Sequence, residues 1–98
     1  MSRRVVFLPA ARQEVASAQD WYEREVPGLG LRFLQALDAQ VVRISENPLQ
    51  FPLRLQDVRS ARLRRFPYSV FFRVTEDQVA SIACFHASRD PMVWTGRV

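Results

Sequence analysis

The chain has 98 residues, of which 48% are hydrophobic and 24% are charged, and its net charge is +4. This length allows one domain with a thin core. The composition excludes a disordered chain, a collagen-like chain and a coiled coil. We therefore expect residues 1–98 to form a single domain.

Cysteine usage limits both the redox compartment and metal binding. A single cysteine, Cys84, excludes an internal disulfide and suits a reducing cytoplasm. Cys84 and His86 are the only soft metal ligands, so a zinc site would need two carboxylates in addition. We expect no metal and no cofactor. No apolar run approaches the ~20 residues of a membrane-spanning helix.

The basic residues are all arginines. Fourteen arginines and no lysine exclude Schiff-base and lysine general-base chemistry. Residues 1–58 hold as many acids as arginines, so the net positive charge lies in residues 59–98. The segment between Asp57 and Glu76 contains no acid and five arginines: Arg59, Arg62, Arg64, Arg65 and Arg73. This segment is the strongest electrostatic feature of the chain and favours an anionic partner.

The N-terminal half predicts one strand and two helices. Residues 5–8 are apolar and β-branched, which predicts a buried strand that ends at Pro9. From residue 10 the apolar residues follow a helical period, and Trp21 borders their stripe. Pro27 and two glycines within residues 26–30 end this helix and reverse the chain. A second helix is predicted over residues 31–46, antiparallel to the first.

The C-terminal half predicts three strands, over residues 60–66, 68–75 and 78–86. Residues 49–58 are ambiguous, because two prolines favour a loop or a weak edge strand. Strand alternation predicts Arg62 and Arg64 on one face and Arg65 on the other. It also predicts Ile82 on the face of Cys84 and His86, with Ala83 and Phe85 on the opposite face.

The element order β-α-α-β-β-β predicts an α+β fold of two layers. A helical hairpin covers one face of a mainly antiparallel sheet. The other face should be partly open and available to a partner.

Two side chains suggest acid–base chemistry. His86 is the only histidine, and it can pair with Tyr68 or with a carboxylate. The alternative is a structural histidine held by hydrogen bonds. Cys84 lies two residues before His86, and strand geometry separates such side chains by ~7 Å, too far for a direct thiolate–imidazolium pair.

The arginines of residues 59–73 alternate with aromatic residues, a pattern typical of single-strand nucleic-acid binding. The alternative is that Phe71 and Phe72 lie on opposite faces of the sheet as core and cover, while the arginines are solvated. Both interpretations stay open at this point.

Several segments together resemble a known family. They are Trp21-Tyr22-Glu23, Gly28-Leu29-Gly30, Phe33, Pro48 with Phe51-Pro52, Arg62, Phe66-Pro67-Tyr68, and His86 with Arg89, Pro91, Trp94 and Arg97. This ordered set is similar to the RelE/ParE superfamily of type II toxin–antitoxin toxins and spans nearly the whole chain. The resemblance implies a single RelE-like domain whose first strand lies beside its last. It also implies a cytoplasmic growth-inhibiting toxin that a cognate antitoxin neutralises.

The resemblance leaves two branches. RelE-like members cut mRNA in the ribosomal A site with basic, acidic and Tyr or His groups; here the matching residues are Arg62, Arg64, Tyr68 and His86. The absence of lysine departs from that pattern. The hairpin turn, Phe66-Pro67-Tyr68 and the tail look more like the ParE branch, whose toxins poison DNA gyrase and have no known chemistry of their own. We therefore favour a non-enzymatic, ParE-like toxin.

The resemblance also implies contact residues. The C-terminal part is implicated in ParE toxicity, so Arg89, Trp94 and Arg97 are the expected target contacts. Trp94 has the alternative role of packing the tail onto the sheet. The net charge of +4 predicts an acidic antitoxin, and Trp21 on the helical hairpin is its expected contact. The free toxin should be less soluble than the complex.

Overall fold

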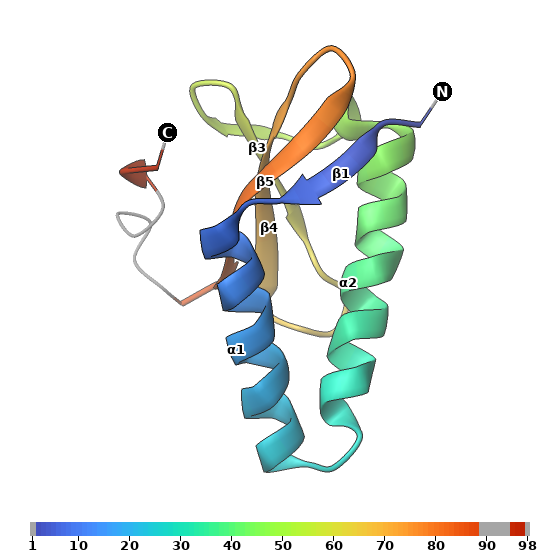
Figure 1. Cartoon of the computed structure of the whole chain (residues 1–98), viewed down its shortest axis with the longest axis vertical. Coiled ribbons are helices and arrows are strands. Elements are labelled where there is room, and N and C mark those ends of the chain that lie inside the picture. Colours follow the sequence, from blue (N-terminus) through green and yellow to red (C-terminus); the bar gives the residue numbers. More distant parts are fainter. Residues whose placement is uncertain (1, 89–94, 98) are drawn as a thin grey trace.

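The computed structural model describes residues 2–88 and 95–97. These residues form the predicted α+β fold, in which two helices pack on a mainly antiparallel sheet (Figure 1). The sheet has five strands, one more than the predicted order contains. The elements in chain order are β1 (Arg4–Phe7), α1 (Pro9–Glu25), α2 (Leu29–Glu46), the 3-10 helix η1 (Pro48–Gln50), β2 (Leu53–Leu55), β3 (Val58–Arg62), β4 (Tyr68–Val74) and β5 (Gln78–His86). No helix of the described residues is long and apolar enough to cross a membrane.

The two helices form the predicted antiparallel hairpin (Figure 1). Pro9 occupies the first turn of α1, where its missing N–H needs no partner. Gly28 reverses the chain with φ of 90°, a left-handed conformation that favours glycine. α2 begins at Leu29, two residues earlier than predicted, because the Glu23 carboxylate accepts hydrogen bonds from the N–H groups of Gly28 (2.9 Å) and Gly30 (3.0 Å).

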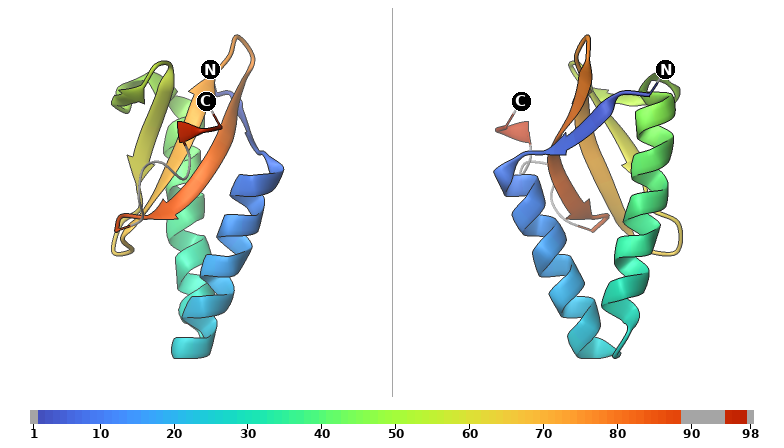
Figure 2. Two further views of the ribbon diagram at one scale, coloured as in Figure 1. Left: turned by 90° about the vertical axis from the view of Figure 1, so that its left-hand side faces the viewer. Right: turned by 45° about the vertical axis from the view of Figure 1, so that its right-hand side comes forward.

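The strand order is β1-β5-β4-β3-β2. β1 pairs with β5 in parallel, and the other neighbours are antiparallel. The first strand therefore lies beside the last, as the family resemblance implied. The two side views in Figure 2 show both helices on one side of the sheet, with the far end of the hairpin extending beyond it.

The strand predicted over residues 60–66 has different bounds in the structure. The ambiguous residues 49–58 contain η1 and the three-residue edge strand β2. β3 begins at Val58 and already ends at Arg62, and Arg65 has φ of 69°, which turns the chain toward β4. Arg64 and Arg65 thus lie in a loop. The prediction that Arg62 and Arg64 share one face of a strand is wrong, because strand alternation stops before Arg64.

A β-bulge interrupts the pairing of β4 with β5. Phe71 pairs with Ala83 and Phe72 pairs with Ser81, which leaves Ile82 as the extra residue. Ile82 packs with Ala83 and Phe85 in one buried cluster, whereas Cys84 belongs to the cluster under the helices. The prediction that Ile82 shares the face of Cys84 is wrong, because the bulge shifts the alternation by one residue.

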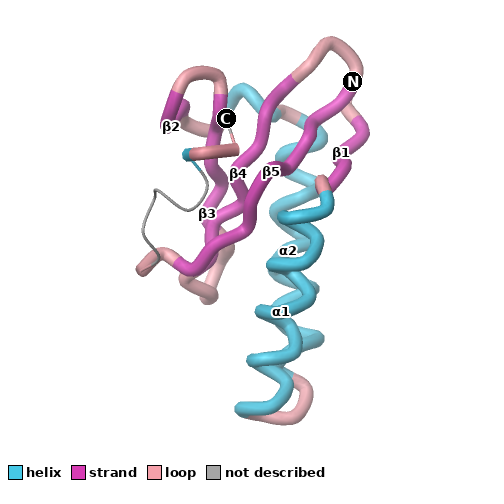
Figure 3. Tube along the Cα trace, turned by 60° about the vertical axis from the view of Figure 1, so that its left-hand side comes forward, coloured by secondary structure: helices cyan, strands magenta, loops and turns pink. Residues whose placement is uncertain are grey.

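The buried apolar side chains form two clusters on opposite faces of the sheet. The larger cluster lies between helices and sheet and includes Phe33, Ile44 and Phe72. The smaller one lies on the other face and consists of Val58, Ile82, Ala83 and Phe85, with Phe71 packed against it. Phe71 and Phe72 therefore lie on opposite faces, as one of the two interpretations predicted. Figure 3 shows helices and strands as separate layers, with the C-terminal end beside the strands.

Candidate functional site

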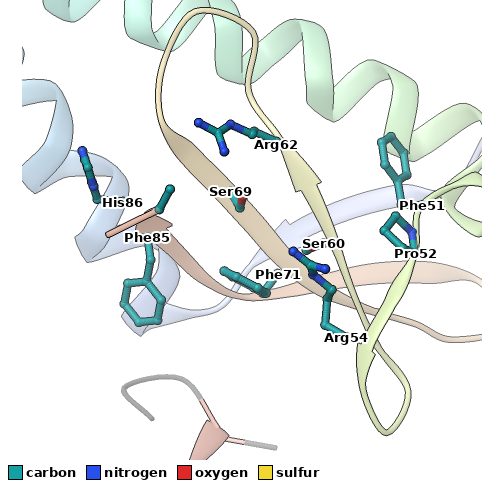
Figure 4. Close-up of a pocket in the computed structure, with 10 residues that line it drawn as sticks. Phe51, Pro52, Arg54, Ser60, Arg62, Ser69, Phe71, Phe85 and His86 are labelled. Atoms are coloured by element: carbon teal, nitrogen blue, oxygen red, sulfur yellow. The ribbon is translucent and has the colours of Figure 1, made fainter. Parts of the chain in front are cut away.

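A pocket of about 640 Å³ lies on the sheet face that the helices leave uncovered. Figure 4 shows Arg54 and Arg62 at this pocket, one from β2 and one from the end of β3. The remaining lining residues are Phe51, Pro52, Ser60, Ser69, Phe71, Phe85, His86 and Ala87. We call this cavity the open-face pocket.

Strand register explains which side chains meet there. Ser60 pairs with Phe71, and Ser69 lies between Arg62 and Phe85 in the pairing of β3, β4 and β5. Directly paired residues project to the same face, so these side chains converge. Within residues 2–88 and 95–97, neither Arg54 nor Arg62 has an ion-pair partner, and both are exposed. Two free guanidinium groups at one pocket attract anions.

Tyr68 and His86 pair in register at the opposite face of the sheet. Their ring centroids lie 5.3 Å apart in an edge-to-face arrangement. The Tyr68 ring also contacts Tyr22 and Phe33 from the two helices, at centroid distances of 6.0 and 5.3 Å. Tyr68 is thus part of the aromatic core, and it projects away from the face that carries Arg62.

The His86 ring is oriented by the turn that follows β5. Its Nδ1 accepts a hydrogen bond from the Ser88 N–H at 3.0 Å, and the Ser88 hydroxyl lies 2.7 Å from the same nitrogen. Because Nδ1 accepts, the neutral imidazole carries its proton on Nε2. His86 lines both the open-face pocket and the cavity beside α1. Among the predicted site residues that the structure describes, His86 alone lines both of these cavities.

The other predicted nuclease and target residues are Arg64, Arg89, Trp94 and Arg97. Arg64 is exposed in the loop between β3 and β4 and lines none of the three cavities described. Arg89 and Trp94 lie outside the described residues. Arg97 is described, and its guanidinium forms an ion pair with Glu14 of α1 at 3.0 Å.

Trp21, the predicted antitoxin contact, lies on α1 with 49% of its surface exposed. Its ring meets Tyr22 edge to face at 5.1 Å between centroids. It lines a cavity of about 840 Å³ between α1 and the ends of β4 and β5, together with Tyr68 and His86. An exposed aromatic side chain beside a cavity is typical of a protein-binding surface.

Cys84 is unsuited to nucleophilic chemistry. The residue is 1% exposed, and burial, with a further contribution from the charge of Glu14, raises the pKa of its thiol to about 12. The thiol is therefore protonated at neutral pH and is a poor nucleophile. Among the described residues there is also no group of three or more His, Cys, Asp or Glu side chains that could hold a metal ion.

The sequence matches the family model described as "ParE toxin of type II toxin-antitoxin system, parDE" over residues 5–91. The chain belongs to the ParE toxin family. It is a toxin of type II toxin–antitoxin systems within the RelE/ParE superfamily. No curated protein matches its sequence with significant similarity.

Solved structures of the superfamily share the fold of this ParE-family chain. A chain of the chromosomal ParDE system from P. aeruginosa is 21% identical, with a TM-score of 0.76 and coverage of 87% of this chain and 96% of that one. The toxin–antitoxin complex RelBE2 from Mycobacterium tuberculosis contains a chain that is 25% identical, with a TM-score of 0.62 and coverage of 88% and 99%. A free mutant of the E. coli toxin RelE is 20% identical, with a TM-score of 0.70 and coverage of 100% and 99%.

Two residues at these sites, Arg54 and Glu14, were not identified from the sequence of the ParE-family toxin. Arg54 lies within residues 49–58, where the prolines left a loop and a weak edge strand equally open. Its side chain therefore could not be assigned to a face of the sheet. Glu14 had no predicted role, yet it binds Arg97 and the N–H of Cys84. These contacts join residues 83 and 70 positions apart, and no local pattern reports them.

Proposed function

We propose that this toxin inhibits DNA gyrase by stoichiometric binding in the cytoplasm and that a cognate acidic antitoxin neutralises it. The observation that carries the proposal is the match of residues 5–91 to the ParE family model. The positive charge of the chain supports an acidic antitoxin through charge complementarity.

The geometry supports binding over catalysis. The residues that line the open-face pocket supply guanidinium and hydroxyl groups, and among them only His86 is a general acid or base. Tyr68, the best partner of His86, pairs with it in register on the face that the helices cover, whereas Arg62 projects to the other face. The guanidinium of Arg62 and the acid–base pair of Tyr68 and His86 are therefore not assembled around one substrate.

The proposed antitoxin surface is the helical hairpin around Trp21. This residue is half exposed and borders the cavity beside α1. The lining of this cavity combines aromatic rings with the charged side chain of Arg24. The solved relatives from P. aeruginosa and M. tuberculosis are toxin–antitoxin systems or complexes, which supports an antitoxin partner here. We expect Trp21→Ala to weaken antitoxin binding by 2 kcal/mol or more, about the effect of a central aromatic contact.

The proposed target surface is the C-terminal segment that carries Arg89, Trp94 and Arg97. The first two lie outside the described residues, and the proposal for them rests on the family resemblance. Arg97 lies at the surface of the sheet, with 29% of its side chain exposed.

A supercoiling assay with purified gyrase tests the proposed function. Toxin should block the introduction of supercoils and increase cleaved DNA after denaturation of the complex. Antitoxin added at an equimolar amount should restore supercoiling. Unchanged gyrase activity at a large excess of toxin would refute the proposal.

A ribosome-dependent mRNA endonuclease is the second candidate. One observation favours it: Arg62 and His86 line the same pocket, where a guanidinium can neutralise a phosphate and an imidazole can move a proton. Primer extension on translated mRNA would then show new ends in the presence of toxin. Loss of these ends in His86→Ala, with the fold retained, would support this candidate.

A further inference from the structure

Within residues 2–88 and 95–97, about half of the outer edge of β5 has no strand beside it. β1 pairs with β5 only from Gln78 to Ser81, whereas β5 continues to His86. The free edge of a strand exposes N–H and C=O groups that need partners. Along residues 82–86 these groups cannot be satisfied by β1, which has already ended at Phe7.

Two side chains take over part of this role. The Cys84 N–H donates to Oε1 of Glu14 at 3.0 Å. The Ile82 carbonyl accepts from Nη1 of Arg97 at 3.1 Å. One of these side chains comes from α1 and the other from the C-terminal segment, so both bind the stretch of β5 that β1 does not cover.

Glu14 and Arg97 also bind each other. Nη1 and Nη2 of Arg97 lie 3.0 and 3.1 Å from the two carboxylate oxygens, which is a bidentate pair. The Arg97 guanidinium carbon lies 5.1 Å from the centre of the Phe85 ring, over its face. Only 29% of the Arg97 side chain and 20% of the Glu14 side chain are exposed, so water screens this pair less than a surface pair.

The guanidinium of Arg97 therefore contacts α1, the bulge of β5 and the outer apolar cluster at once. Ile82, whose carbonyl it binds, is the extra residue of the bulge. These three contacts hold the Arg97 side chain against the sheet. Its guanidinium is therefore engaged by groups of the toxin itself.

We propose that Glu14 and Arg97 are positioning residues that hold residues 95–97 against β5 in the geometry that the target binds. This inference rests on the proposed function, in which the C-terminal segment contacts gyrase. It assigns Arg97 an indirect role, through the segment it anchors, and it gives Glu14, on the first helix, an effect on toxicity.

A double-mutant cycle with Glu14→Gln and Arg97→Gln tests the inference. Glutamine at position 14 keeps an oxygen for the Cys84 N–H and removes the charge. Each single variant should raise the toxin concentration for half-inhibition of gyrase at least about fivefold. The double variant should raise this concentration no further, because each single variant already lacks the ion pair between Glu14 and Arg97. Circular dichroism and antitoxin affinity should match those of the wild type.

The matched control is Arg73→Gln. This change breaks the other ion pair of the described residues, between Arg73 of β4 and Asp57 at 3.0 Å. Because this pair is more exposed, we expect half-inhibition to change by less than about twofold.

Equal inhibition by wild type and both single variants would overturn the inference, as would multiplicative effects in the double variant. Stronger inhibition by the single variants would also overturn it, because the contact would then restrain the toxin.

Amide hydrogen exchange separates this inference from the proposed function. Peptides covering residues 87–98 should exchange faster in Glu14→Gln and Arg97→Gln than in the wild type, whatever the target is. If wild-type toxin leaves gyrase active, the proposed function fails while the exchange result still reports the anchoring. Unchanged exchange in both variants would overturn the anchoring itself.

Discussion

At the scale of single residues, a buried amide connects α2 to the end of β3. Gln40 is 5% exposed, and its Nε2 donates to the Arg62 carbonyl at 2.6 Å. Its Oε1 accepts from Nη1 of Arg43 at 3.0 Å. Both polar atoms of the side chain are satisfied, so Gln40 fixes the backbone of the residue that carries a guanidinium to the open-face pocket.

Replacing this amide should therefore destabilise the fold. We expect Gln40→Leu to lower the free energy of unfolding by about 1–3 kcal/mol, because the Arg62 carbonyl loses its partner. Urea denaturation measures the change. Gln35→Leu, at an exposed position of the same helix, is the control and should change stability by less than about 0.5 kcal/mol. Equal losses in the two variants would show that the buried hydrogen bonds contribute nothing.

The buried thiol gives a prediction about pH. The folded-state pKa of Cys84, about 12, lies above the ordinary 9.0, so its contribution to stability is complete below pH 9.0 and is lost as the pH rises toward 12. The stability of the wild type relative to Cys84→Ala should therefore fall on going from neutral to alkaline pH. Urea denaturation of both proteins over that range measures the difference. A difference independent of pH would contradict the raised pKa.

At the scale of elements, the connection between α1 and α2 depends on one carboxylate. Glu23 binds the N–H groups of Gly28 and Gly30, which the first turn of α2 leaves without partners. We expect Glu23→Ala to lower the free energy of unfolding by about 1–2 kcal/mol, as the loss of a helix cap does. Thermal denaturation measures this loss of stability. The control is Glu25→Ala, at an exposed position of the same helix. A loss no larger than that of the control would refute the capping role.

The helices were predictable from sequence because their signals are local. The apolar spacing, Pro9, Pro27 and Gly28 are all read within a few residues, and both helices lie where these signals placed them. The start of α2 was missed by two residues, because the capping carboxylate comes from the preceding helix.

The strands were less predictable because their faces depend on pairing. The bulge at Ile82 arises from the register between β4 and β5, which no residue of β5 signals alone. The position of β1 beside β5 followed only from the family resemblance, and their parallel direction was not predicted. Of the predicted site, the faces of Arg64 and Arg65 could not be predicted by strand alternation, because β3 ends at Arg62 and both residues lie in the loop that follows.

At the scale of the whole molecule, the sheet has one covered and one partly covered face. The helices cover the first, and the second carries the open-face pocket beside the small cluster around Phe85. Arg97 lies over that ring, so the C-terminal segment meets the sheet near the pocket. Guanidinium groups of Arg54 and Arg62 at this pocket attract anionic groups of a partner.

The most direct test of stoichiometric inhibition is a titration of gyrase supercoiling activity with toxin at a gyrase concentration well above the dissociation constant. Activity should fall linearly with added toxin and reach its minimum at a fixed molar ratio near one toxin per gyrase active site. Full activity throughout this titration, with truncated transcripts accumulating over many turnovers when the same toxin meets translating ribosomes, would contradict the proposed function.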